Sequence, residues 1–294
     1  MAGETYGADP SCSNPYGRNS NGPTLHGIDT SEAQGANFSF DKAAADNVRF
    51  CFHKATQGTG YVDKTFARNW RASKDAGLLR GAYHFLNPSA NIDMQVDNYL
   101  RALDYVGGLQ NDDLHSMLDA EVSHGVGPAD LAFLIMDWIE KAEEKTGREV
   151  LIYTGPNFWR TSVVPGLSSV DAAEIAKRKL FIAHYVVDPS NGNVYNLQRP
   201  IVPAPFTDFK IWQVTGNRGA RIPGTAGPED RDTYWGDEIQ FRNDFTKQKF
   251  EVIDGAATPI RAGGGVQVVP LDGGEYGVSD DGRPTDPGGG DNST

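Results

Sequence analysis

Short apolar runs alternate with amphipathic stretches along most of the chain. The apolar runs are LHGI from residue 25, VRFCFHKA from 48, LLRGAYHFL from 78, LHSMLDAE from 114 and VLIYT from 150. Helix-like stretches follow them at 39–46, 64–76, 91–105, 129–146 and 171–178. This alternation predicts βα units whose strands pair largely in parallel.

The stretch 129–146 has the clearest helical period. Its apolar residues recur at spacings of three and four and therefore share one face: Leu131, Leu134, Ile135, Trp138, Ile139 and Ala142. Pro128 precedes the stretch and Gly147 follows it, as is typical of a helix start and stop. We expect its Trp and Met side chains to pack in the core.

After Lys179 the apolar runs follow one another with weak or absent helices between them. They are LFIAHY from 180, FKIWQVT from 209, and ARIPG from 220 leading to DTYWGDEIQF. Five βα units and three further strands make eight, enough to close an irregular α/β barrel of the (β/α)5(β)3, TIM-like kind.

Both ends of the chain have a different composition. Residues 1–24 are polar and rich in turn formers, and 255–294 are rich in Gly, Pro and Asp. We therefore predict a polar leader at 1–24, a catalytic barrel at 25–254 and a mostly disordered tail at 255–294. Within the tail, VQVVPL could add an edge strand.

Composition narrows the classes of function. The 294 residues are 38% hydrophobic and 22% charged, and no apolar run reaches the roughly 18 residues of a membrane span. A net charge of -12 argues against a nucleic-acid partner, because phosphate binding depends on clustered Lys and Arg. The first residues form no secretory signal, so action outside the cell would need another export route or a missing leader. Cys12 and Cys51 could pair, or could be one free and one buried thiol.

Acidic residues recur where the predicted strands end. Asp29 ends LHGID, Asp119 and Glu121 end LHSMLDAE, and Asp230 with Asp232 follows the last candidate strand. In a barrel, function gathers at the C-terminal ends of the strands. Alternation within a strand puts Asp119 and Glu121 on the same side, about 6.6 Å apart along the backbone.

Two carboxyls held together in an apolar setting do not both ionise easily, so the less solvated one keeps its proton towards neutral pH. Glycosidic cleavage needs such inequality, because one acid protonates the leaving oxygen while negative groups stabilise an oxocarbenium-like centre. We predict Glu121 as the acid because its longer side chain reaches further. The competing interpretation is that Asp119 caps a loop and Glu121 pairs with a surface Lys or Arg.

Aromatic side chains near the same strand ends suit a carbohydrate, since a sugar face can stack on a ring. We predict a substrate-binding set made of Tyr83, Phe85, Tyr153, Tyr185, Trp212 and Gln213. Taken singly, each ring could equally be core. No glycine-rich phosphate loop follows a strand, which argues against a nucleotide site.

A metal-dependent hydrolase is the alternative that the histidines permit. His84, His115 and His124 lie near the acidic strand ends, but their spacing fits no strong metal-binding pattern. A Ser or Cys nucleophile lacks support, because no G-x-S-x-G elbow exists and Cys51 lies inside an apolar run.

Several blocks in order resemble glycoside hydrolase family 25, the Chalaropsis-type lysozymes that include many phage endolysins. The blocks are GIDTSEAQ at 27–34, FHKATQGTGYVD at 52–63, AGLLRGAYHF at 76–85, LDAE at 118–121, IYT at 152–154, IAHY at 182–185, IWQVT at 211–215 and DRDTYWG at 230–236. The resemblance spans about 27 to 240 and implies an irregular barrel of five βα units and three further strands.

The resemblance also implies an activity: hydrolysis of the β-1,4 bond between N-acetylmuramic acid and N-acetylglucosamine in peptidoglycan, with retention and without metal or organic cofactor. By motif, Glu121 would be the proton donor and Asp119 would stabilise the substrate's acetamido group, whose oxygen participates in the reaction. Asp29 and Asp230 match acidic residues that line the family's groove. We expect a monomer acting at the bacterial cell wall, with neither nucleic acid nor membrane as partner.

The chain departs from the family pattern in two places. The late block reads Asp230-Arg231-Asp232 where Asp-x-Asn is expected, so either acid could face the groove, and position favours Asp230. The segment between Asp188 and Asp208 is long, which leaves the sugar preference open. A relative that binds glycan without cleaving it is the remaining alternative.

Overall fold

The computed structural model describes residues 17–186, 197–216, 222, 225, 229–253 and 256–260. The chain divides into two compact units, Met1–Lys247 and Gln248–Thr294, so the first unit ends before the predicted boundary at residue 254. In the second unit, β10 (Lys249–Ile253) pairs antiparallel with β11 (Ala256–Ile260). Most of the predicted leader and tail, including VQVVPL, lies outside the described residues.

Eight strands of the first unit close into a barrel, which confirms the predicted fold class. They are β1 (Thr24–Thr30), β2 (Val48–Gln57), β4 (Leu79–Phe85), β5 (Ser116–Asp119), β6 (Val150–Thr154), β7 (Leu180–Ala183), β8 (Ile211–Thr215) and β9 (Asp230–Trp235). The order around the barrel is β1-β9-β8-β7-β6-β5-β4-β2, and pairing of β2 with β1 closes the ring. The short strand β3 (Tyr61–Val62) pairs with β2 at the edge.

One strand of the barrel runs against the others. All pairs from β1 through β2 and on to β8 are parallel, whereas β9 is antiparallel to both β8 and β1. The start of β9 therefore lies at the same end of the barrel as the ends of the other strands.

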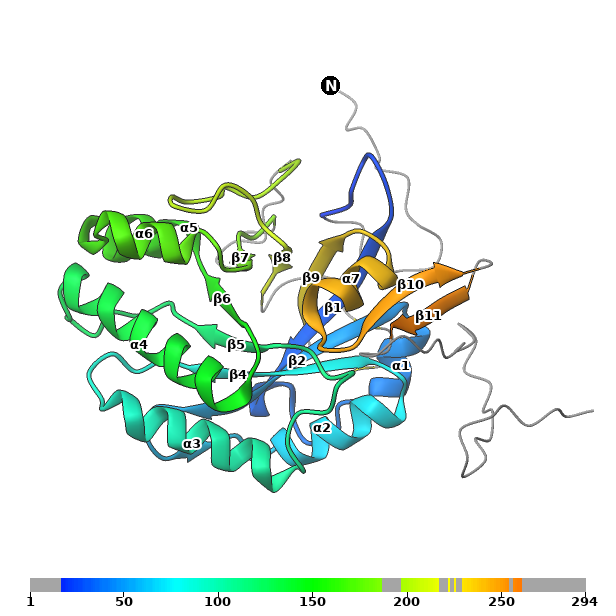
Figure 1. Ribbon diagram of the computed structural model, residues 1–294. Coiled ribbons are helices and arrows are strands. Elements are labelled where there is room, and N and C mark those ends of the chain that lie inside the picture. The colour runs from blue at the N-terminus through cyan, green and yellow to red at the C-terminus, as the bar shows by residue number, and fades with distance from the viewer. Residues whose placement is uncertain are drawn as a thin grey trace, which may run out of the picture. The chain divides into compact units, whose positions relative to one another are not determined.

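Helices α2, α3 and α4 lie outside the strands, as Figure 1 shows. The α-helices are α1 (Phe40–Ala45), α2 (Phe66–Asp75), α3 (Ile92–Tyr105), α4 (Pro128–Thr146), α5 (Pro156–Phe158), α6 (Ser169–Ile175) and α7 (Glu238–Phe245). Short turns of other helix types are η1 (Glu32–Gln34), η2 (Trp159–Val163) and η3 (Val164–Gly166). Among the described residues, no helix is both long and apolar enough to span a membrane.

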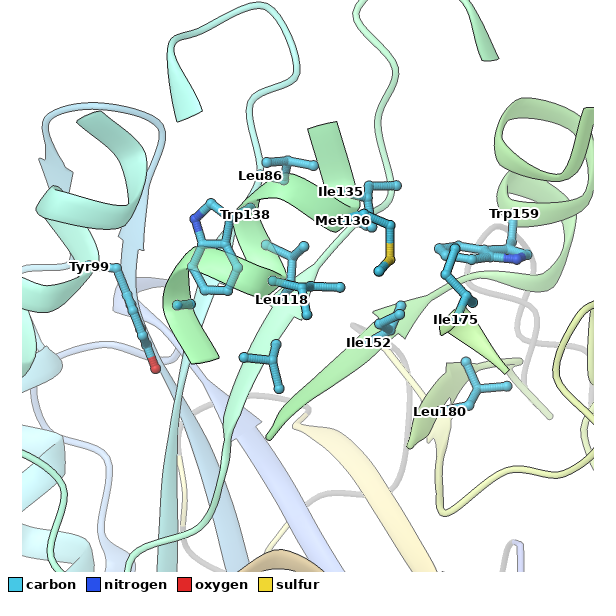
Figure 2. Close-up of a cluster of buried hydrophobic side chains, with 14 of the residues drawn as sticks. Leu86, Tyr99, Leu118, Ile135, Met136, Trp138, Ile152, Trp159, Ile175 and Leu180 are labelled. Carbon is cyan, nitrogen blue, oxygen red and sulfur yellow. The ribbon is translucent and has the colours of Figure 1, made fainter. Parts of the chain in front are cut away.

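Helix α4 matches its prediction closely. Pro128 is its first residue, and Gly147 ends it in a left-handed conformation with φ of 63°. Trp138 and Met136 are buried in the layer between helices and barrel. Figure 2 shows this layer, with Leu118 of β5 and Ile152 of β6 in the same hydrophobic cluster as α4.

Aromatic rings fill the barrel interior and explain two glycines. A Cβ on Gly27 would lie 2.2 Å from the Phe50 ring, and one on Gly81 would lie 2.5 Å from the Phe52 ring. Both rings are fully buried. Because interiors pack at crystal-like density, a side chain at either glycine would displace a ring.

Helix α7 corrects the sequence prediction, which treated DTYWGDEIQF as one strand-like run. The strand ends at Trp235, and Asp237 begins the helix with a capping box that includes Gln240. Phe241 and Phe245, one helical turn apart, are buried with the interior cluster. Only these two side chains of the helix are buried, so the apolar period is too short to register as helical.

Candidate active site

A pocket of about 360 Å³ opens at the carboxyl ends of the parallel strands. It is lined by Asp29, Lys54, Tyr83, Phe85, Met117, Asp119, Glu121, Tyr153, Tyr185, Gln213, Gly216 and Asp230. The structure thus brings together all the predicted site residues except Trp212. Asp29 and the Asp119/Glu121 pair share one pocket, as the sequence hypothesis required.

Backbone pairing beyond the end of β5 directs Glu121 into this pocket. The Ala120 amide donates to the Tyr153 carbonyl at 2.9 Å, and the Thr154 hydroxyl donates to the Ala120 carbonyl at 2.7 Å. The chain therefore stays extended through Ala120, and alternation gives Asp119 and Glu121 the same face. Within the described residues, neither carboxyl forms an ion pair, and Asp119 Oδ1 is buried without a hydrogen bond. The loop-cap and surface-pair interpretation therefore has no support.

Asp230 reaches the pocket by a different route from the one predicted. It does not follow the last strand but begins β9, where it lies directly across from Asp29 of β1. Because β9 is antiparallel, its first residue meets the last residues of its neighbours. Of the two acids in the late block, Asp230 lines the pocket, whereas Asp232 lies two residues further into the barrel and is fully buried.

Hydrogen bonds hold the floor of the pocket in place. The Tyr153 hydroxyl donates to Gln213 Oε1 at 2.8 Å, and Gln213 Nε2 donates to Asp29 Oδ2. The Asp230 carboxyl lies across from that of Asp29, and a hydrogen bond between the two would need a proton on one of them. Both polar atoms of the Gln213 side chain are thus bonded to protein groups, so its role in this structure is to orient Asp29.

Burial raises the pKa values of these acids. It is the largest cause that raises the pKa of Asp29 well above its usual value, and the charges of Asp230 and Asp232 add to the effect. Burial likewise raises the pKa of Asp230 to about 6, opposed by its hydrogen bond with Asp29. Such inequality between neighbouring carboxyls is what acid-base chemistry requires.

Asp119 and Glu121 lie together at the other side of the pocket. Burial raises the pKa of Asp119 well above its usual value, and the Glu121 charge raises it further. Glu121 is exposed at the mouth, yet the pocket walls still raise its pKa, with Lys54 opposing. The protons belong to the pair rather than to either residue alone. Position separates their roles, since Glu121 faces the entrance and Asp119 the floor.

Three lining residues were missed by sequence reasoning, Lys54, Met117 and Gly216, and Lys54 is the charged one. It extends from β2 towards the acids, donates to Gln57 Oε1 at 2.8 Å, and lies 4.8 Å from the centroid of the Phe85 ring. It was visible in the family block FHKATQ, but a single Lys in an apolar run carried no signal by itself. Lys54 also lines a second depression of about 560 Å³ with Tyr61 and Lys64, so the groove continues past the acids.

Trp212 does not line the pocket, which corrects its place in the substrate-binding set. Its ring is fully buried between barrel and helices, and its Nε1 donates to the His184 carbonyl at 2.7 Å. Alternation along β8 points Gln213 inward and therefore Trp212 outward. The ring is core.

The histidines considered as metal ligands lie apart from one another. His84 is buried against Trp138 and contacts Thr56 Oγ1 at 2.7 Å, whereas His124 is exposed and contacts Asn87 Oδ1. His115 lies 3.8 Å from Glu149. Within the described part of the chain, no three His, Cys, Asp or Glu residues form a metal-binding group.

Cys51 is a free thiol buried on the outer side of β2, where burial raises its pKa to about 12. A thiol that keeps its proton is a poor nucleophile. Cys12 lies outside the described residues.

Comparison with known proteins gives a consistent result. The sequence model for "Glycosyl hydrolases family 25" matches residues 28–223. The uncharacterised protein YegX of Escherichia coli K12 is 30% identical over 225 residues, covering 74% of this chain and 72% of YegX. Lysozyme M1 of Streptomyces globisporus is 29% identical over 219 residues, covering 72% of this chain and 68% of the lysozyme.

Solved structures agree with this. The bacterial lysozyme from Streptomyces coelicolor superposes with a TM-score of 0.64 at 27% identity, covering 76% of this chain and 97% of the lysozyme. The family GH25 lysozyme from Aspergillus fumigatus superposes with a TM-score of 0.60 at 25% identity, covering 75% and 98%. Since the family match covers more than half of the sequence and the barrel agrees, this chain belongs to glycoside hydrolase family 25.

Proposed function

We propose that this protein is a muramidase that hydrolyses the β-1,4 bond between N-acetylmuramic acid and N-acetylglucosamine in bacterial peptidoglycan. The observation that carries the proposal is one pocket holding Asp119 and Glu121 on the same face, opposite Asp29 and Asp230. The relatives named as lysozymes support the same substrate.

In the proposed reaction, Glu121 donates its proton to the glycosidic oxygen as the bond to the sugar C1 breaks. The acetamido oxygen of the same sugar attacks C1, and Asp119 stabilises the charge on the acetamido nitrogen. The unpartnered Oδ1 of Asp119 is an acceptor suited to that N–H group. Water then attacks C1, the bond between C1 and the acetamido oxygen breaks to restore the acetamide, and the water gives a proton to Glu121; two inversions at C1 retain the anomeric configuration.

The remaining groups favour the positive charge that develops at C1. The pocket gathers acids from β1, β5 and β9 against Lys54, so its charge balance is negative once these acids ionise. Preorganised charge in a partly dry site is worth more than the same charge in water. The half-buried Tyr185 and Phe85 rings at the rim provide surfaces on which sugar faces can stack. The depression beyond Lys54 leaves room for a polymer.

Mass spectrometry of digested peptidoglycan tests the proposal. Fragments that end in reducing muramic acid are expected, and NMR of the first product should reveal the retained anomer. Fragments ending in reducing glucosamine would instead identify a glucosaminidase. Binding without new reducing ends would identify a glycan-binding relative, and loss of activity with a chelator would identify a metal-dependent hydrolase.

A further inference from the structure

Asp232 is a carboxyl for which the mechanism above has no use. Its side chain is fully buried, and neither oxygen has a hydrogen-bond partner among the described residues. The strand register sets it between Gly27 of β1 and Gln213 of β8, and alternation points it into the barrel. Gly27, which lies across from Asp232 on β1, has no side chain that could bond to it. Asp232 therefore lies below the pocket floor, and its two carboxyl oxygens have no hydrogen-bond partner among the described residues.

Keeping such a group costs stability. An ionised carboxylate in an apolar interior without a partner is far less favourable than a neutral one. Asparagine would preserve the shape without the charge. A residue that is expensive for the fold and unnecessary for packing calls for a role in the site above it.

The charge of the adjacent Arg231 opposes the rise in the pKa of Asp232, but no hydrogen bond to its carboxyl is found among the described residues. Pointing into the barrel are Asp230 and Tyr234 of β9, Asp29 of β1, Lys54 of β2, Tyr83 of β4, Asp119 of β5 and Tyr153 of β6, while β8 contributes the neutral Gln213. The side chains of the outer face point away from Asp232. Arg231 pairs there with Asp46 at 2.6 Å. His26 and Ile28 of β1 also point outward, as does Cys51, which contacts His53. Deeper in the barrel, Asp244 of α7 accepts a hydrogen bond from the Tyr234 hydroxyl. The inward-facing cation, Lys54, is at the pocket end.

We propose that Asp232 is a positioning residue that acts through Asp29 and Asp230, setting the pH range in which this pair carries the negative charge used in catalysis. The three carboxyls belong to two neighbouring strands, so a charge on one disfavours ionisation of the others. Asp232 is one of the causes that raise the pKa of Asp29, which is consistent with this coupling. The inference rests on the proposed function.

The test is the pH dependence of kcat/KM for soluble peptidoglycan fragments, compared between wild type and Asp232→Asn. Removing one carboxyl from the group lets the other two ionise more readily, so the acidic limb should move to lower pH by about one unit. An unchanged limb in an active, folded variant would overturn the proposal. If the Asn variant does not fold, Asp232→Ser is neutral and smaller, and the same shift is required of it.

Thermal unfolding provides a second readout that does not depend on activity. The folded pKa of Asp232 is raised above the unfolded value, so Asp232 contributes a loss of stability with rising pH that the Asn variant lacks, whereas the loss from Asp29 and Asp230 remains in both proteins. The melting temperature of Asp232→Asn should exceed that of wild type at pH 7 and equal it near pH 3. A melting temperature of Asp232→Asn below that of wild type at pH 7 would show that the Asp232 carboxylate has a stabilising partner, and would contradict the proposal.

Asp113→Asn is the matched control. Asp113 is equally buried, but it pairs with Arg80 at 2.7 Å at the far end of the barrel. Its replacement should lower the melting temperature at pH 7 and leave the pH profile unmoved. Failure of wild type to release reducing muramic acid would refute the muramidase proposal itself, whereas an active wild type with coincident profiles would refute only the role of Asp232.

Discussion

The two ends of the barrel handle buried charge in opposite ways. At the carboxyl ends of the strands, Asp29, Asp119 and Asp230 converge with few compensating partners. At the amino ends, Arg80 Nε donates to Asp113 Oδ1 at 2.7 Å, and the guanidinium also lies 4.2 Å from the centroid of the Trp70 ring.

Compensation at the second end extends to backbone groups around Asp113. The Gln110 amide donates to Asp113 Oδ2 at 2.8 Å, and Arg148 donates to the Asp113 carbonyl at 2.8 Å. A compensated charge stabilises the fold and has nothing left to offer a ligand. A buried carboxyl without a partner costs stability, has a raised pKa and remains available to a ligand. The comparison therefore assigns the chemistry to the carboxyl ends of the strands and a structural role to the amino ends.

Glu121→Gln should break the active end with the largest effect. The amide keeps the shape of the side chain but cannot supply the proton, so the lytic rate should fall by about 10²- to 10⁴-fold. The melting temperature should stay within a degree or two of wild type, because Glu121 is exposed and forms no ion pair within the described residues. Clearing of peptidoglycan suspensions measures the first and calorimetry the second. A variant that lyses walls at the normal rate would remove Glu121 from the mechanism.

Arg80→Met should break the structural end. It leaves the Asp113 carboxylate buried without its cation, at a cost of about 3–5 kcal/mol in the free energy of unfolding. Denaturant titration measures this cost, and the lytic rate per folded molecule should be unchanged. Arg101→Met, an exposed arginine on α3, is the control and should shift stability by less than about 0.5 kcal/mol. Equal effects of the two variants would contradict the comparison.

The contrast also explains what the sequence could predict. Apolar runs ending in Asp29, Asp119 and Glu121 located the active end, because parallel strands finish at the same edge. The direction of β9 could not be read, since it depends on pairing with β1 and β8 far away in the chain. Asp230, favoured by its position in the block, lines the pocket, but it begins its strand instead of following the last one.

The sequence also could not show which side chains of a strand point into the barrel. Trp212 and Gln213 are adjacent, and a fully buried strand has no polar face that would say which of them points inward. Only the contact of Gln213 with Asp29 settles it. The buried core of α4 was predictable because its apolar period runs over about three turns, whereas α7 has two buried residues.

Lys54→Met sharpens the comparison by removing the cation that moderates the acids. Lys54 lowers the pKa of both Asp119 and Glu121, so its loss should let the pair keep protons to higher pH. The alkaline limb of the kcat/KM profile should move upward by about half a unit to one unit, with the optimum rate reduced by about tenfold. Lys64→Met is the control: Lys64 is exposed, pairs with Glu32 at 3.3 Å, and should leave the limb in place. A downward shift for Lys54→Met would reverse the assigned electrostatics.

The smallest expected effect is the pH dependence of stability contributed by Asp230. Burial raises its pKa to about 6 in the folded protein, above the roughly 3.9 of an unfolded Asp. The folded state therefore binds the proton more tightly, and this stabilisation is complete below about pH 4 and is lost as pH rises to about 6.

Asp230→Asn should abolish that loss. The melting temperature of the variant relative to wild type should rise by a few degrees between pH 4 and pH 6 and then level off, whereas the exposed Asp208→Asn should give a flat difference. A constant difference for Asp230→Asn would mean that its carboxyl is as well solvated as a surface acid. The chemistry at the carboxyl ends of the strands would then depend on the Asp119/Glu121 pair alone. Only that side of the pocket would still differ from the compensated charges at the amino ends.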